Sequence, residues 1–352
     1  MSQGEIAELS QEFVTVALLI MLVATILLSV DLAGRITASR QRRRTTEGVA
    51  PAVSVGAGAP ASSPARSAEP DDRGSWSNES GRDTRDDRPG TSRSYSAGIA
   101  STMLATALLA VGVVARAIGV GRAPWGNMYE FSITGALIAL VVLLVVVRTT
   151  TGRMLAVWVT GLVSVLLIAA VTVLYVPPGE LVPALRHYWM ILHVGVTVIA
   201  FGLFTVAAIV SALQIVAERR ARSRTPVAAS AAPDETGVEG AGSDTVLPSP
   251  ERLDRLAYRI IAVGFPLWTL GPIIMGAIWA EVSWGRYWGW DPKEVWAFIS
   301  WVVYAAYLHA RATAGWKGRR ASIIALIGFV TVLFSYFGVN LFFGGLHAYD
   351  GL

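Results

Sequence analysis

The chain has 352 residues, of which 53% are hydrophobic, and its formal net charge is +4. A soluble globular domain cannot bury that much apolar surface. Several apolar runs reach the roughly 18–20 residues that cross a hydrocarbon layer of about 30 Å. The sequence has no cysteine, which excludes disulfides, thiolate catalysis and iron–sulfur clusters. The basic residues are gathered between the apolar runs, so they report topology in a lipid bilayer and no nucleic-acid binding.

These features predict an all-α, polytopic integral membrane bundle with about eight transmembrane helices. In chain order, the expected spans are Val14–Val30, Gly98–Gly119, Met128–Val147, Leu155–Val176, Trp189–Ala217, Tyr258–Ala280, Val295–Ala310 and Ala321–Phe343. The first run lacks a positively charged start and a small-residue cleavage site, so we expect a retained helix. Arg42, Arg43 and Arg44 follow it and mark the cytoplasmic side, and alternation then places both termini outside.

Composition divides the chain into membrane segments and two linkers. The expected segments are a first transmembrane helix (1–34), a cytoplasmic linker (35–97), spans two to five (98–218), a second cytoplasmic linker (219–254) and spans six to eight (255–352), the last with an external Trp-rich loop (279–296). Both linkers are rich in Ala, Pro, Ser, Gly and mixed charge. Such segments cannot bury enough apolar surface to offset the entropy of ordering, so we expect disorder there.

Two short stretches read as helix starts. In "DPKE", Asp291 can cap the helix, Pro292 suits its first position, and Glu294 stands where it can reach back to the cap. "NMYE" has the same pattern, with Asn127 as the cap and Glu130 three residues later. Asp291 is therefore expected to be a helix cap and not a catalytic acid.

The stretch "WGRYWGW" before Asp291 is expected to be a loop. It places Trp284, Trp288 and Trp290 within seven residues, and Gly285 and Gly289 allow tight turns. Three indoles on one loop exceed what anchoring at the membrane interface requires. Their faces form a platform for a large, flat, apolar ligand.

The remaining aromatic and basic residues near this loop have simpler interpretations. We expect Trp125, Trp189 and Trp279 to belong to the interfacial aromatic belt. Arg286 and Lys293 could pair with carboxylates at the edge of the flat ligand, or with lipid phosphates, and the sequence favours neither partner.

The chain contains four histidines. His193 lies at the outer end of the fifth span and His347 just past the outer end of the eighth, both at the depth of the Trp loop. Two neutral imidazoles approaching a flat ligand from both faces are the axial ligands of a six-coordinate haem, although a single His is more often hydrogen-bonded within the bundle. His309 follows the Asp291 cap by about 27 Å of helix, near the inner end of its span. His187 is expected in a loop or at the interface.

Four stretches resemble one known family. "WGRYWGWDPKEVWAFISWVVYAAYLHAR" looks like the tryptophan-rich WWD signature of haem-handling membrane proteins, in the CcsA (ResC) branch that works with a ResB-type partner. "PWGNMYEF" at Pro124–Phe131, "LVPALRHYWMILHV" at Leu181–Val194 and "FGVNLFFGGLHAY" at Phe337–Tyr349 agree with it. The resemblance covers most of the chain from Ser96 on, apart from the second linker.

The resemblance implies a machine that attaches haem to apocytochrome c outside the bacterial cytoplasmic membrane. Haem, b-type before attachment, would be held on the Trp loop with His193 and His347 as axial ligands, until a CxxCH segment displaces one ligand. His309 would contribute to an inner haem site. The expected haem-binding residues are His193, His347, His309, Trp284, Trp288, Trp290, Asp291, Arg286 and Lys293. The family assigns no role to His187 or to the first linker.

No nucleophile or acid–base pair is evident, so we expect the chain to act mainly by positioning haem, as a subunit of a cytochrome c synthase (haem lyase) complex. Two alternatives remain. A b-type electron-transfer protein would usually place paired histidines on facing membrane helices. A transporter of a flat anionic solute would show interrupted helices and repeats at the membrane midplane.

Overall fold

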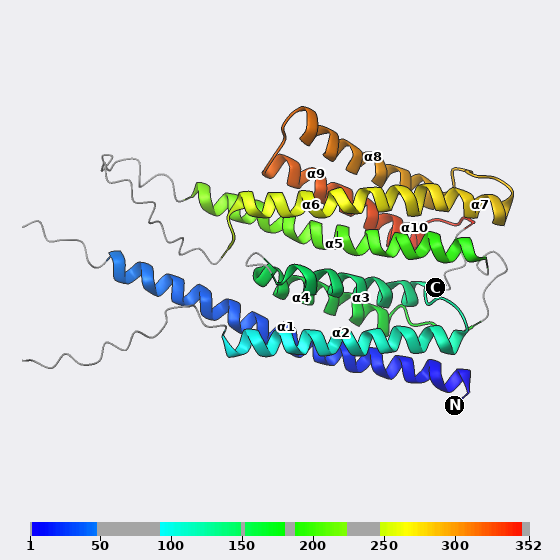
Figure 1. Ribbon diagram of the computed structural model, residues 1–352, viewed down its shortest axis with the longest axis horizontal. Helices are drawn as coiled ribbons and strands as arrows, with labels where there is room; N and C mark the ends of the chain where they lie inside the picture. The colour runs from blue at the N-terminus through cyan, green and yellow to red at the C-terminus, as the bar shows by residue number, and fades with distance from the viewer. Residues whose placement is uncertain (1, 48–91, 149–151, 180–186, 224–246, 347–352) are drawn as a thin grey trace, which may run out of the picture.

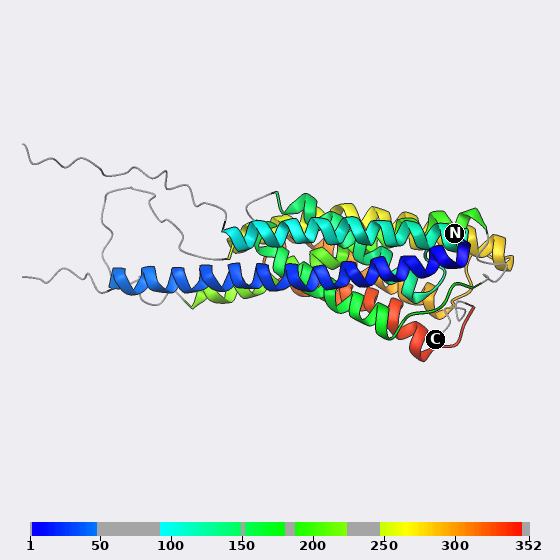
Figure 2. The same cartoon turned by 90° about the horizontal axis from the view of Figure 1, so that it is seen from below.

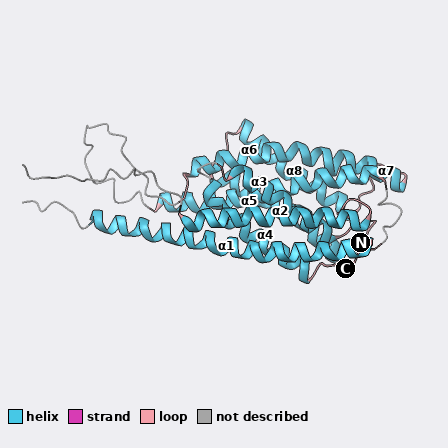
Figure 3. Ribbon diagram, turned by 60° about the horizontal axis from the view of Figure 1, so that its bottom comes forward, coloured by secondary structure: helices cyan, strands magenta, loops and turns pink. Residues whose placement is uncertain are grey.

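The computed structural model describes residues 2–47, 92–148, 152–179, 187–223 and 247–346, and within them there are helices and loops but no strand (Figure 3). The helices are α1 (Gln3–Glu47), α2 (Arg93–Val120), α3 (Met128–Val146), α4 (Gly152–Thr172), α5 (Tyr188–Arg222), α6 (Pro250–Trp268), η3 (Thr269–Met275), α7 (Gly276–Trp284), α8 (Pro292–Thr313), α9 (Arg319–Leu333), η4 (Phe334–Gly338) and α10 (Val339–Phe342). The all-α prediction is confirmed.

The helices form one elongated bundle along a common axis (Figure 1). α1 packs against α2 and α4, α3 packs against α4 and α5, and α5 packs against α6 and α9. α8 lies against α9 on the far side of the bundle from α1. The start of α1, α7 and α10 lie at the same end, which we call the α7 end, and α1 extends beyond the other helices at the opposite end (Figure 2).

Within the described residues, seven helices are long and apolar enough to cross a membrane, one fewer than the sequence predicted. They are Gly4–Gln41, Arg93–Val120, Met128–Val146, Arg153–Thr172, Tyr188–Arg222, Pro250–Trp284 and Arg319–Phe342. The predicted span missing from these seven, Val295–Ala310, lies in α8, which is helical and connects the two ends of the bundle. Its Trp, Tyr and charged residues lower its hydropathy, although it packs along α9 as the others do.

Both predicted linkers are shorter than composition indicated. α1 continues to Glu47, well into the first linker, and α5 ends only at Arg222. The extension of α1 is rich in residues that tolerate a helix, and the Asp31–Arg35 pair supports it, with 2.8 Å between Oδ2 and Nε one turn apart. The central parts of the two linkers, 48–91 and 224–246, lie outside the described residues.

Candidate functional site

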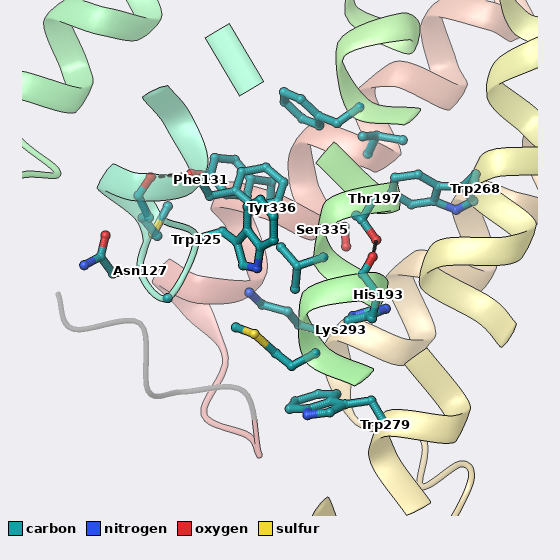
Figure 4. A pocket seen from close by; sticks show the side chains of 16 residues that line it. Trp125, Asn127, Phe131, His193, Thr197, Trp268, Trp279, Lys293, Ser335 and Tyr336 are labelled. Carbon is teal, nitrogen blue, oxygen red and sulfur yellow. Dashed lines mark hydrogen bonds between the residues drawn. The ribbon is translucent and has the colours of Figure 1, made fainter. Parts of the chain in front are cut away.

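Two neighbouring cavities open into the bundle at the α7 end. The bundle cavity includes Trp125, Phe131 and Tyr336, and the loop cavity includes Trp288 and Glu294. Six residues line both cavities: His193, Thr197, Trp268, Trp279, Lys293 and Ser335. His193 and Lys293 therefore stand at the junction of the two spaces. Figure 4 shows both side chains among the residues that line the bundle cavity.

The imidazole of His193 has a defined orientation. Its Nδ1 lies 2.9 Å from the carbonyl oxygen of Gly271 in η3. A carbonyl can only accept a hydrogen bond, so Nδ1 carries the proton and the lone pair of the neutral ring is on Nε2. Proteins commonly orient a metal-binding imidazole in this way, through a backbone carbonyl that fixes the other nitrogen.

The helix that supplies this carbonyl is widened at that point. Pro272 has no N–H to donate, and the segment Thr269–Met275 is a π-helix in which the Gly276 N–H bonds to Gly271 O. Gly276 also faces the histidine, since a Cβ there would lie 2.9 Å from His193 Cε1. The π-turn and the missing side chain together make room for the ring.

Of the three tryptophans expected in an interfacial belt, one is buried inside the bundle. Trp279 is 2% exposed and stacks on His193, with ring centroids 5.8 Å apart and planes within 7°, so the belt prediction was wrong for it. It also meets Trp284 edge-on at 4.7 Å. Trp125 lines the bundle cavity, and Trp189 packs against the buried Trp279 cluster. Hydropathy gives depth in the membrane but not which face of a helix is buried, which is why the sequence misplaced Trp279.

The Trp loop is short and is held by hydrogen bonds. α7 continues through Trp284, so the loop begins one residue later than predicted, at Gly285, whose φ of 70° confirms the expected tight turn. Trp290 has a φ of 57°, a left-handed conformation that costs a non-glycine residue roughly 1–2 kcal/mol. The Glu294 carboxylate holds this turn by accepting two backbone N–H groups, that of Gly289 at 2.7 Å and that of Asp291 at 3.1 Å.

Asp291 joins the loop to the C-terminal segment. The predicted capping box is confirmed: the Asp291 side chain accepts the Lys293 N–H at 3.1 Å, and Glu294 reaches back to the cap. The second carboxylate oxygen accepts the Leu346 N–H at 2.8 Å. His347 itself lies outside the described residues, but the residue before it is bonded to the start of α8.

The other expected ligand-binding residues fall into two groups. Trp284, Trp288 and Lys293 line the loop cavity. Trp290 is 67% exposed and meets Trp288 edge-on at 5.9 Å, and it lines neither cavity. The Arg286 guanidinium covers Gly289, and a Cβ at position 289 would lie 1.8 Å from it. Gly289 therefore makes room for this contact, and its φ is not in the left-handed region that favours glycine.

A buried ion-pair cluster beside the cavities escaped the sequence analysis. Asn127 caps α3 as predicted, by accepting the Glu130 N–H at 2.9 Å. Glu130, however, does not reach back to the cap residue. Its carboxylate accepts from Arg116 at 2.9 Å, Arg122 at 2.6 Å and the Gly126 N–H at 2.8 Å. An arginine inside the apolar second span was the available signal, since buried charges in membranes need partners.

The two remaining described histidines are remote from the cavities. His309 is exposed near the end of α8 opposite the α7 end, two residues before Arg311, which forms a two-pronged ion pair with Asp254 at 2.8 and 2.9 Å. His187 caps α5, where its ring accepts the Trp189 N–H at 3.3 Å. The described residues contain no cluster of three or more His, Cys, Asp or Glu that could hold a metal ion.

Residues 125–347 match the cytochrome C assembly protein family. The cytochrome c biogenesis protein CcsA of Microcystis aeruginosa is 36% identical over 290 residues, which cover 72% of this chain and 87% of that protein. CcsA of Thermosynechococcus vestitus is 38% identical over 268 residues, or 67% and 82% of the two chains. CcsA of Gloeobacter violaceus is 40% identical over 210 residues, 49% of this chain and 62% of the relative, which is less than two thirds of its length.

One solved structure, the cytochrome c haem lyase CcmF, has the same fold. It superposes with a TM-score of 0.55 at 14% identity, covering 96% of this chain and 47% of CcmF. At that identity the likeness concerns the fold alone. The family match, in contrast, includes every residue that lines the two cavities. The chain therefore belongs to the cytochrome c assembly protein family, as a CcsA-type member.

Proposed function

We propose that this chain holds haem at the α7 end and presents it for covalent attachment to the CxxCH segment of an apocytochrome c. The reaction would take place on the outer face of a bacterial cytoplasmic membrane, in a complex with a ResB-type partner. The observation that carries the proposal is His193, whose ring is fixed by Gly271 and Trp279 at the junction of two aromatic cavities.

The residues at this junction suit haem as a cargo. Haem is a large, flat, apolar ring with an iron that accepts imidazole nitrogen and with two carboxylates at one edge. His193 offers Nε2, Trp284 and Trp288 offer ring surface, and Lys293 offers a cation. The bond between Leu346 and Asp291 supports a second ligand from His347, because it fixes the preceding residue beside the loop.

The chemistry requires little of the chain beyond position. Each cysteine thiol adds across one vinyl double bond of haem, so that a carbon–sulfur and a carbon–hydrogen bond form without net oxidation. If the chain holds the vinyl carbons near the thiols, the addition becomes effectively unimolecular, which lowers its entropic barrier. The exposed Trp290 and Arg286 lie where an incoming polypeptide would arrive.

The test is cytochrome c maturation in cells whose own copy of the chain is replaced by variants. His193→Ala should abolish covalent haem attachment at normal membrane levels of the protein. His187→Ala is the matched control, because it removes an imidazole from the same helix start but from outside both cavities. Normal covalent haem in a His193→Ala/His347→Ala double variant would rule the proposal out.

A further inference from the structure

The indole nitrogen of Trp125 is a buried hydrogen-bond donor with no acceptor among the described residues. An indole N–H can only donate. Leaving a buried donor without a partner costs about 1–3 kcal/mol, and such groups in folded proteins usually mark a place where something else binds. The ring itself is only partly buried and lines the bundle cavity (Figure 4).

Contacts on both sides of Trp125 and at its ring hold the indole in place. On one side, the Thr134 hydroxyl donates to Pro124 O at 3.1 Å, and on the other, the Gly126 N–H donates to the Glu130 carboxylate at 2.8 Å. The ring packs on the surface of α5, where a Cβ on Gly195 would lie 3.5 Å from it. The backbone on both sides and the face of the ring are thus fixed, so the N–H is presented in one direction, as a preorganised binding group requires.

The charge around this donor selects the kind of ligand. Lys293 lines the same cavity, and Figure 4 shows its amine end and the Trp125 indole nitrogen turned toward the same part of it. No acidic residue is among the described residues that line the bundle cavity. Two hydroxyls there have acceptors already, since Thr197 donates to His193 O at 2.6 Å and Tyr336 to Met128 O at 2.7 Å. A fixed N–H donor beside an ammonium group fits an anionic acceptor.

We infer that Trp125 Nε1 and Lys293 Nζ bind a carboxylate of the cargo, namely a propionate of a haem held by His193. The three side chains line one cavity, so a single ligand can contact all of them. The inference rests on the proposed function and deepens it by naming the group through which the cargo is recognised. It also favours the ligand carboxylate over lipid phosphate as the partner of Lys293, since the amine is directed into the bundle.

The test is a titration of the purified full chain in detergent with two probes, haemin and haemin dimethyl ester, followed by the Soret band. Trp125→Phe keeps most of the ring and removes the N–H, and Lys293→Gln removes the charge. Each should weaken haemin binding about tenfold, the loss expected for one hydrogen bond to a charged group, and leave ester binding unchanged. Trp158→Phe is the control, because Trp158 is 48% exposed on α4 and lines neither cavity.

Three outcomes would separate the possibilities. If Trp125→Phe weakens haemin and ester equally, the ring contributes packing only and the inference is wrong. Unchanged haemin binding in both variants would overturn it as well. A wild-type chain that binds neither probe, or binds both equally well after His193→Ala, would instead contradict the proposed function. Melting temperatures of the variants, compared with the control, show whether a loss of binding comes from unfolding.

Discussion

The His193 imidazole fits between the Gly271 carbonyl and the Trp279 ring because Gly276 has no side chain. A Cβ at position 276 would lie 2.9 Å from His193 Cε1 and 3.1 Å from Nδ1. Overpacking of this kind costs about 1–3 kcal/mol, and a side chain that borders two cavities can relieve it by moving. We therefore predict that Gly276→Ala tilts the ring away from Gly271 and weakens haem binding about tenfold or more.

Gly34→Ala is the matched control for this change. Position 34 is also helical, and nothing lies within 4 Å of a Cβ there, so binding should stay at the wild-type level and stability should be equal or up to about 1 kcal/mol higher. Haem titration and thermal unfolding should be measured on both variants. Wild-type affinity in Gly276→Ala would show that the position of the imidazole does not limit binding.

Glu130 is the residue on which the Trp125 loop depends. It is fully buried between two arginines, Arg116 and Arg122, and it accepts the Gly126 N–H. Replacing it with Gln removes the only acidic member of this cluster and leaves one buried and one partly buried cation without an anionic partner there, a change that typically costs about 3–5 kcal/mol. We predict a clearly lower melting temperature for Glu130→Gln, together with weaker haemin binding.

The comparison for that prediction is Glu12→Gln, which removes an exposed carboxylate from α1 and should change the free energy of unfolding by less than about 0.5 kcal/mol. If the two variants melt at the same temperature, the cluster does not stabilise the α7 end.

Local rules predicted some of these residues and not others. The cap at Asp291 and the left-handed turn at Gly285 follow from short-range geometry, which a sequence pattern records directly. The three partners of Glu130 and the burial of Trp279 follow from which helices pack together. No pattern within α2, α3 or α7 contains that information, because hydropathy is the same for a side chain that faces lipid and one that faces another apolar helix.

α8 is linked to the loop, the cavities and the C-terminal segment through its N-cap residue, Asp291. Asp291 caps the helix and also accepts the Leu346 N–H, whereas Ser249 caps α6 and accepts only within that helix. Losing either cap should cost about 1 kcal/mol. Only Asp291→Ala should also release the segment before His347, so we predict faster hydrogen exchange at the Leu346 amide in that variant and lower haem affinity.

Ser249→Ala serves as the capping control, with exchange at the Leu346 amide expected to match the wild-type rate. Equal protection of this amide in both variants would mean that the bond to Asp291 does not hold the segment in solution.

Element boundaries were predicted less well than element types. α8 was expected as a span from its position, yet its Trp, Tyr and charged residues make it less apolar than the other seven long helices. α1 runs on to Glu47 because a helix that has already begun can continue into polar sequence at little cost per residue. The change from apolar to polar sequence at residue 35 therefore does not mark the end of the helix.

The bundle as a whole presents His309 on its outside. The side chain is exposed on α8, at the end opposite the two cavities, and an ionisable residue facing lipid is costly unless another group meets it. A ResB-type partner packed on this face would provide the second ligand of an inner haem. We predict that the complex with its partner retains more haem than the purified chain alone, and that His309→Ala abolishes the difference.

Arg311→Ala is the comparison for His309→Ala. It breaks the ion pair with Asp254 at the same end of α8 and leaves the His309 imidazole in place. It should lower stability while the complex keeps its additional haem. Equal haem content of the complex with and without His309 would assign this residue a structural role only.

The most direct test of the account is the absorption spectrum of the purified complex in wild-type form and with His193→Gly, each recorded with and without added imidazole. The wild type should show a low-spin, six-coordinate haem. The variant should lose much of its haem, or show a five-coordinate spectrum, because the ligand held by Gly271 is missing. Imidazole should enter the space left at the iron and restore the low-spin bands. A variant with unchanged haem content and an unchanged low-spin spectrum without imidazole would contradict the account.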